Sequence, residues 1–221
     1  ELLTFSKIEM KQMRISVRKG DIMHFLEELS HIFDIVAGER EIDFIVNLED
    51  TEEEVWFSPS KLERILYNLL SNAFKYTQPG GYVKLSAKLI KEEKGTFVQI
   101  SVKDNGRGIP KEAQEQIFES YYQVEKRDHR EGFGLGLSLT RSLIHMHKGE
   151  IRVESEINKG SDFIVTLNVS EDAYNPDERS SENITTEEIQ KYNQRIKETI
   201  ELIPEKLTNK EKDPARESVS Y

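Results

Sequence analysis

The chain has 221 residues, a formal net charge of −10 and no cysteine, and its composition is 36% hydrophobic and 33% charged. This length is enough for one sizeable core with appendages. The missing cysteines exclude disulfides and thiolate metal sites and fit a reducing compartment, and the acidic balance disfavours a protein that grips nucleic acid through clustered lysine and arginine. No apolar run reaches the roughly 18 residues that a membrane-spanning helix needs. We therefore expect a polar globular protein without nucleic-acid or membrane contacts.

The first part of the chain predicts a helix end, a strand and a second helix. Residues 1–12 carry apolar side chains at helical spacing. Because the chain starts at Glu1 rather than at Met, we interpret this segment as the end of a helix from a longer protein. Residues 13–17 alternate in polarity as a short strand does. Residues 19–21, Lys-Gly-Asp, predict a turn and a cap for a helix that runs to about Ala37.

Strands and helices then alternate along the middle of the chain. The predicted strands are 42–48, 54–57, 82–90, 96–103, 150–156 and 161–168, and the predicted helices are 59–76 and 137–147. Ser58 and Pro59 give the first of these helices a cap and a first-turn proline. Helices and strands in this mixture predict an α/β fold, a two-layer sandwich with helices on one face of a mixed sheet.

The chain changes in character after Val169, where acidic residues outnumber basic ones. The capping box formed by Thr185 and Glu188 predicts one helix, which Pro204 ends or weakens. Its apolar stripe is Ile189, Tyr192, Ile196, Ile200 and Ile203. This helix either docks on the preceding domain or binds a partner. Beyond about residue 206 the composition is typical of disorder.

A helix with two internal asparagines is the first candidate for chemistry. In 61-KLERILYNLLSNAFKYT-77 the side chains of Asn68, Asn72 and Lys75 fall within about 60° of one another at helical spacing. Asparagine is a poor helix former, so two of them one turn apart need a reason. An amide oxygen suits Mg²⁺ and a nearby lysine can contact phosphate. The alternative is a solvated polar face.

The second candidate is 104-DNGRGIP-110, directly after a predicted strand. Asp-Asn-Gly is also an ordinary turn sequence. In a functional interpretation the Asp104 carboxylate accepts a hydrogen bond from the exocyclic amine of adenine. Gly106 and Gly108 then allow the backbone to approach the base, and Ile109 lies against its ring.

The third candidate is 132-GFGLGLSLT-140, which leads into a helix. Glycines free the backbone to wrap phosphates, and the N-terminus of the following helix attracts anions. Charged loop residues rather than a strand precede this run, so it is not a dinucleotide fingerprint. No Walker-type phosphate loop occurs in the sequence. A mobile glycine-rich loop is the alternative.

In this order and spacing, the three segments resemble the N, G1 and G2 boxes of the Bergerat-fold ATPases, the superfamily of gyrase, MutL and sensor histidine kinases. Residues 117–125 resemble the F box of histidine kinases, with Phe118 as its aromatic, and residues 159–161 resemble the last glycine box. Residues 2–9 resemble the end of the second helix of a dimerisation and phosphoacceptor domain. The divisions that this resemblance implies are 1–12, the end of that helix, 13–169, the ATP-binding catalytic domain, and 170–221, an acidic tail or linker.

The resemblance also implies the roles of single residues. Asn72 is the expected Mg²⁺ ligand with Asn68 as its helper, Lys75 touches phosphate and Asp104 reads adenine. Residues 119–135 form a mobile lid over the phosphates of ATP, in which His129 and its basic neighbours could touch phosphate. The residues expected to contact the nucleotide are Asn68, Asn72, Lys75, Tyr76, Asp104, Gly106, Gly108, Ile109, Phe118, Arg130, Gly132, Gly134, Leu135, Gly136 and Leu137.

Asn68 distinguishes the members of this superfamily. Members that hydrolyse ATP carry a glutamate there as general base, and an asparagine cannot accept a proton. The resemblance therefore implies slow ATP hydrolysis and in-line attack of a histidine on the γ-phosphate of Mg·ATP, because a neutral imidazole is already nucleophilic. None of the five histidines has the sequence context of a phosphoacceptor. We expect the acceptor to lie outside this fragment.

The resemblance finally implies partners and a cellular place. The implied partners are the protein's own dimerisation and phosphoacceptor domain, within a homodimer, and a response-regulator receiver domain. The implied location is the cytoplasm, where this chain would be the intracellular part of a membrane-anchored sensor. The alternatives are a nucleotide-sensing regulatory module that transfers nothing and a hydrolytic ATPase. Two departures from the family pattern are Gln123, where many relatives have arginine, and Asp162, where threonine is common.

Overall fold

A mixed sheet forms one layer of the fold. The computed structural model describes residues 14–120, 122 and 135–201, and within them the main sheet has five strands in the order β2-β4-β5-β7-β6. The strands are β2 (Asp43–Leu48), β4 (Tyr82–Glu92), β5 (Gly95–Asp104), β6 (Glu150–Glu156) and β7 (Gly160–Asn168). β2 and β4 run parallel, and the other neighbours are antiparallel. The predicted mixed sheet is thus confirmed.

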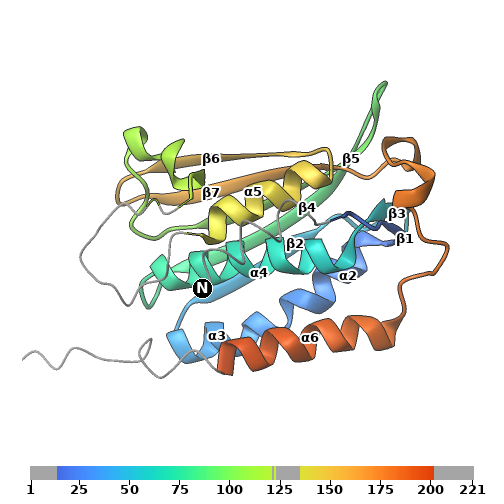
Figure 1. Ribbon diagram of the computed structural model, residues 1–221. Helices are drawn as coiled ribbons and strands as arrows, with labels where there is room; N and C mark the ends of the chain where they lie inside the picture. Colours follow the sequence, from blue (N-terminus) through green and yellow to red (C-terminus); the bar gives the residue numbers. More distant parts are fainter. Residues whose placement is uncertain (1–13, 121, 123–134, 202–221) are drawn as a thin grey trace, which may run out of the picture.

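The helices form the second layer, on one face of this sheet. They are α2 (Ile22–Ser30), α3 (Ile32–Arg40), α4 (Pro59–Tyr76), α5 (Gly136–Met146) and α6 (Thr186–Glu201). Figure 1 shows α4 and α5 along the sheet, with α2, α3 and α6 beyond α4. This arrangement is the two-layer α/β sandwich that the sequence predicts.

Helix α4 is the element that joins the core to the candidate site. Its apolar positions Leu62, Leu66, Leu69 and Ala73 are buried as predicted. Near its end the Phe74 ring stacks on Phe33, with ring centres 5.7 Å apart, and the Arg40 guanidinium donates to the Phe74 carbonyl. This bond satisfies a carbonyl that the helix end leaves without a partner. The C-terminal turn of α4 is therefore held firmly.

The N-terminal region corrects two predictions. The strand predicted at 13–17 begins later: β1 (Arg18–Asp21) pairs antiparallel with β3 (Glu54–Phe57) in a separate small sheet. Ile15 and Val17 do alternate inward, but their burial comes from packing against Tyr174 rather than from a strand ladder.

The single helix predicted up to Ala37 is two helices, with the break at His31. The Ser30 hydroxyl donates to the Glu27 carbonyl at 2.7 Å and so competes for the backbone bonds that would continue the helix. The predicted cap of α4 also differs, since the Ser58 side chain makes no cap hydrogen bond.

Helix α6 docks on the preceding domain. Ile189, Tyr192 and Ile196 are buried, and the Tyr192 ring meets Phe25 edge-on at 5.8 Å between ring centres. Of the two alternatives that the sequence leaves open for this helix, the structure shows the docked one. Ile203, Pro204, the segment beyond 206 and the predicted helix end at 1–12 lie outside the described residues.

Candidate nucleotide-binding site

The structure brings the first and third motifs together through Asn68. Its side-chain nitrogen donates to the Gly136 carbonyl at 2.6 Å and to the Thr140 hydroxyl at 2.8 Å. A Cβ added at Gly136 would lie 2.9 Å from the Asn68 side-chain oxygen, so a larger residue there would have to displace the amide. Asn68 thus fixes the N-terminal turn of α5 against the middle of α4.

Asn72 and Lys75 follow on α4, one turn further toward its C-terminus. Asn72 is half-buried, and its side chain makes no hydrogen bond to any residue that the structure describes. The Lys75 ammonium lies 5.0 Å from the centre of the Tyr76 ring. An amide that is held in a fixed helix and has no partner among the described residues is suited to a ligand from outside the chain.

Asp104 ends β5 beside this turn of α4, and it is only 5% exposed. The Gly106 amide donates to its Oδ1 at 2.8 Å. Burial raises the pKa of the Asp104 carboxyl, while the backbone amides of Gly106 and Ser161 oppose this rise. No cationic side chain of the described segments forms an ion pair with Asp104. A buried carboxylate that has no cationic partner within the described segments is an unusual arrangement, and perturbed carboxyl groups of this kind are candidates for functional roles.

The loop after Asp104 is wedged between two backbone segments. A Cβ at Gly106 would lie 2.3 Å from the Tyr76 carbonyl oxygen, at the end of α4. Gly108 has φ +70°, and a Cβ there would lie 2.0 Å from the Glu156 carbonyl oxygen, at the end of β6. Both glycines are therefore needed for packing, and the loop holds α4 and the sheet at a fixed distance.

Arg107 lies between these glycines, and no feature of the sequence singles it out. Its guanidinium carbon lies 4.3 Å from the Tyr76 ring centre, and its carbonyl accepts from the Asn158 amide at 2.8 Å. Tyr76 is consequently flanked by the cations of Lys75 and Arg107. This contact depends on how α4 meets the loop, which residue spacing does not reveal.

Ser155 and Gln114 are further residues that the sequence does not single out. The Ile109 amide donates to the Ser155 hydroxyl at 2.8 Å, and that hydroxyl donates to the Gly160 carbonyl at the same distance. The Gln114 amide donates to the Ile109 and Ser155 carbonyls. The loop that carries Ile109 is thereby tied to the glycine box at the start of β7.

Of the remaining predicted residues, the structure describes four: Phe118, Leu135, Gly136 and Leu137. Phe118 is buried in the core, where its ring meets Phe163 at 6.3 Å between centres, so its contact with nucleotide stays a prediction. Leu135 precedes α5, and Gly136 and Leu137 begin it. Arg130, Gly132, Gly134, His129 and Gln123 lie outside the described residues.

Comparison with known proteins identifies the family. Residues 57–171, more than half of the chain, match the family described as histidine kinase-, DNA gyrase B-, and HSP90-like ATPase. The chain belongs to this family. The match spans every predicted site residue, from Asn68 on α4 to the glycine box before β7.

Among curated relatives, the chain is 30% identical to histidine kinase P4 of Formosa agariphila, over 96% of this chain and 16% of that protein. It is 34% identical to the sensor histidine kinase WalK of Bacillus subtilis, over 78% of this chain and 28% of that protein. Its fold superposes on ShkA, solved at full length in complex with AMPPNP, with a TM-score of 0.66 and 26% identity over 76% of this chain and 34% of ShkA. The chain therefore spans a minor part of these longer proteins.

The departure at Asp162 lies next to the candidate site in the sheet, and its negative charge contributes to the raised pKa of Asp104. Residues alternate between the two faces of a strand, so Asp162 points to the face of β7 opposite Ser161. There its Oδ1 accepts from the Ser101 hydroxyl at 2.6 Å. Asp162 is thus a residue of the open sheet face.

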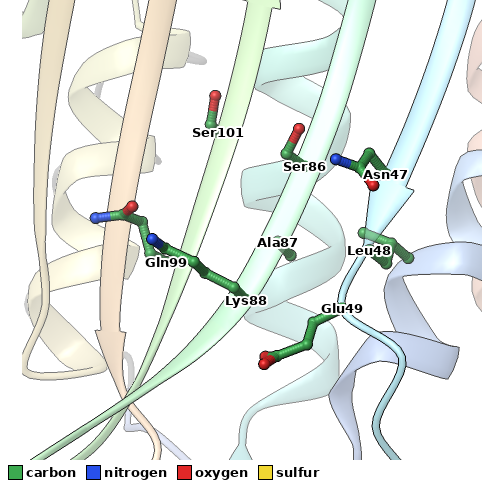
Figure 2. A pocket seen from close by; sticks show the side chains of 8 residues that line it. All are labelled: Asn47, Leu48, Glu49, Ser86, Ala87, Lys88, Gln99 and Ser101. Atoms are coloured by element: carbon green, nitrogen blue, oxygen red, sulfur yellow. The ribbon is translucent and has the colours of Figure 1, made fainter.

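A hollow of about 260 Å³ lies on the same open face, as Figure 2 shows. Its lining residues are Asn47, Leu48, Glu49, Ser86, Ala87, Lys88, Gln99 and Ser101. None of the residues predicted to bind nucleotide lines it, and the Glu49 carboxylate already accepts from the Leu89 amide at 2.6 Å. We therefore separate this hollow from the nucleotide site.

The described part of the chain contains no cluster of three or more histidine, cysteine or acidic residues that could hold a metal ion. Proteins usually bind Mg²⁺ through one or two side chains together with substrate phosphates. The half-buried Asn72 amide fits such a ligand. Within the same residues, no helix combines the length and the apolar character that crossing a bilayer requires.

Proposed function

We propose that this chain is the catalytic ATP-binding unit of a sensor histidine kinase, which transfers the γ-phosphate of Mg·ATP to a histidine for relay to a response regulator. Asn68 carries the proposal. It stands at the position of a general base but cannot accept a proton, and its amide nitrogen is already engaged with Gly136 and Thr140. A water or hydroxyl nucleophile needs such a base, whereas a neutral imidazole does not. The site therefore favours transfer to histidine over hydrolysis.

Each part of the site then has a role. Asp104 accepts from the adenine amine in a dry environment, which selects adenine. Lys75 and the N-terminus of α5 meet the phosphates, where a lysine and the positive end of a helix dipole stabilise anions. Asn72 holds Mg²⁺, which when bound offsets the charge of the triphosphate. The protein's contribution is to position these groups and to stabilise developing charge.

The partners follow from the same proposal. Relatives such as WalK are several times longer than this chain and are named sensor histidine kinases. We propose that the acceptor histidine lies in the protein's own dimerisation and phosphoacceptor domain, that the kinase works as a homodimer in the cytoplasm, and that a receiver domain takes the phosphate.

Asn72→Ala tests the site directly. We expect it to weaken ATP binding about tenfold in the presence of Mg²⁺, because one ligand of the ion is lost, and to change little in EDTA. Isothermal titration calorimetry with and without Mg²⁺ measures this difference. Asn47→Ala, on the open sheet face, is the matched control and should leave affinity unchanged. An equal loss under both conditions would mean that Asn72 contacts the nucleotide itself.

The transfer step is tested by supplying the histidine. The longer protein that contains this chain and its acceptor domain should gain acid-labile phosphate from γ-labelled ATP, with little free phosphate released. ATP binding without any transfer would instead support the nucleotide-sensing module. Steady phosphate release that Asn72→Ala abolishes would support a hydrolytic ATPase.

Arg107→Ala is expected to weaken ATP binding roughly fivefold, because the variant removes a positive charge beside the site and leaves the Tyr76 ring without its contact to the guanidinium. The side chain both orients the Tyr76 ring and adds positive charge beside the site. Arg107→Lys should recover part of the affinity. The control is Arg152→Ala, because Arg152 is exposed on β6 and bonds Glu154. Equal affinities for wild type and Arg107→Ala would show that Tyr76 is held without Arg107.

A further inference from the structure

The segment that follows β7 returns to the beginning of the described chain. We call residues 171–201 the strap and residues 14–18 the connection. The Val17 amide donates to the Glu178 carbonyl at 2.8 Å, and the Ser180 amide donates to the Val17 carbonyl at 2.9 Å. Val17 and Arg179 thus form a parallel bridge outside any named strand. The strap holds the connection through both backbone groups of one residue.

A small apolar cluster reinforces this bridge. Ile15, Val17 and Tyr174 are buried together, in a cluster distinct from the main core. The Tyr174 hydroxyl donates to the Asn168 carbonyl at 2.5 Å, which fixes the tyrosine to the end of β7. The connection therefore packs on a side chain of the strap that is itself anchored to the sheet.

An ion pair and a close steric fit also join the strap to residues 18–20. The Arg18 guanidinium makes two hydrogen bonds to the Glu188 carboxylate, one of them 2.7 Å long, and both side chains are largely shielded from solvent. Two-pronged arginine–carboxylate pairs are among the stronger polar contacts in proteins. A Cβ at Gly20 would lie 2.8 Å from Ile184, so strand β1 also fits closely under the strap.

The far end of the strap is anchored independently of the connection. Tyr192 packs on Phe25, and the Asn193 side chain donates to the Glu28 carbonyl at 3.2 Å. Arg195 lies 3.8 Å from the Glu63 carboxylate on α4. Because these contacts fix α6 to helices α2 and α4, the strap can restrain the connection rather than move with it.

We propose that the strap clamps the connection onto the ATP-binding unit and so restrains the swing of this unit relative to the segment that precedes it. The mechanical part stands on the contacts above, whereas its effect on catalysis rests on the proposed kinase function. Transfer to a histidine on another domain requires the ATP-binding unit to reorient, and such conformational steps often limit turnover.

The first test measures the clamp itself. Hydrogen exchange on the 221-residue chain should show the Val17 and Ser180 amides exchanging about tenfold faster in Arg18→Gln, because the shielded ion pair is lost. The swapped pair, Arg18→Glu with Glu188→Arg, should restore part of the protection. Lys19→Gln is the matched control, since Lys19 pairs with Glu54 at the exposed surface. Unchanged exchange in Arg18→Gln would overturn the clamp.

The second test measures its consequence in the full-length protein. Autophosphorylation should be about threefold faster in Arg18→Gln than in wild type, since a released connection lowers the barrier to reorientation. ATP affinity should be unchanged, because Arg18 lies outside the nucleotide site. An unchanged or slower rate, with faster exchange at Val17, would overturn the restraint. Failure of wild type to bind ATP would instead refute the proposed kinase function and leave the exchange result standing.

Discussion

Asp104→Asn is expected to weaken ATP binding about a hundredfold, which corresponds to a charged hydrogen bond lost in a buried site. The Gly106 amide already donates to one carboxylate oxygen. If asparagine keeps that bond with its oxygen, its NH₂ group faces the adenine amine, and two donors then meet. The variant would thus lose an acceptor for adenine and gain a repulsive contact, while the side chain at position 104 would keep its shape.

Base selectivity makes this prediction sharper. Inosine triphosphate carries an oxygen where ATP carries the amine, so wild type should strongly prefer ATP and Asp104→Asn should largely lose that preference. Calorimetric titration of both nucleotides into both proteins measures this loss of preference for ATP. Glu154→Gln provides the control, because it also replaces a carboxylate by an amide, at an exposed position where Glu154 bonds Arg152. A parallel loss for both nucleotides in Asp104→Asn would indicate a damaged loop rather than a lost adenine contact.

The fold was predictable where local pattern and tertiary burial agree. Helix α4 has a capping position, a first-turn proline and an unbroken apolar stripe, and its predicted end at Tyr76 matches the structure. Strands β4, β5 and β6 alternate in burial over most of their length, because one face packs on helices while the other is open. Burial misled the prediction at Val17, which is fully buried but packs on the strap instead of joining a ladder of strands.

The sequence singles out residue types for the candidate site, but it does not predict the contacts between them. Asn68 could be singled out because asparagine is unfavourable inside a helix, whereas Asp104 and Gly106 could be singled out only through the order and spacing of the three motifs. The bond from Asn68 to Gly136 could not, since it joins residues far apart in the sequence. Arg107 was missed for the same reason. For the strap, the sequence predicts only a helix, with docking on the preceding domain as one of two alternatives. Long-range contacts of this kind depend on how the elements are placed, which periodicity does not encode.

His147 shows how such a contact also controls stability. It follows α5 and is fully buried, with its Nε2 accepting from the Ser58 amide at 3.1 Å and its Nδ1 lying 3.0 Å from the Leu143 carbonyl. Ser58 directly precedes α4, so the neutral imidazole of His147 links the C-terminal end of α5 to the N-terminal end of α4. Burial lowers the pKa of His147 from 6.5 to about 4, opposed by the bond to Leu143 and assisted by Lys61.

The direction of the pH dependence follows from this shift. Between pH 6.5 and about 4 the unfolded chain binds a proton at His147 and the folded chain does not. Acid therefore favours unfolding in this window, and stability is fully present only above pH 6.5. The shift corresponds to a loss of about 3 kcal/mol in the free energy of unfolding as the pH falls to 4.

His147→Gln should remove most of this dependence, because glutamine keeps an acceptor for the Ser58 amide but does not take up a proton. We expect the variant to be less stable than wild type at pH 7.5 and to lose less stability on acidification. Urea unfolding at several pH values between 4.5 and 7.5 measures both quantities. His145→Gln, at an exposed position on the same helix, should retain the wild-type slope. An acid slope in His147→Gln as steep as that of wild type would assign the pH dependence to other groups and leave His147 a packing residue alone.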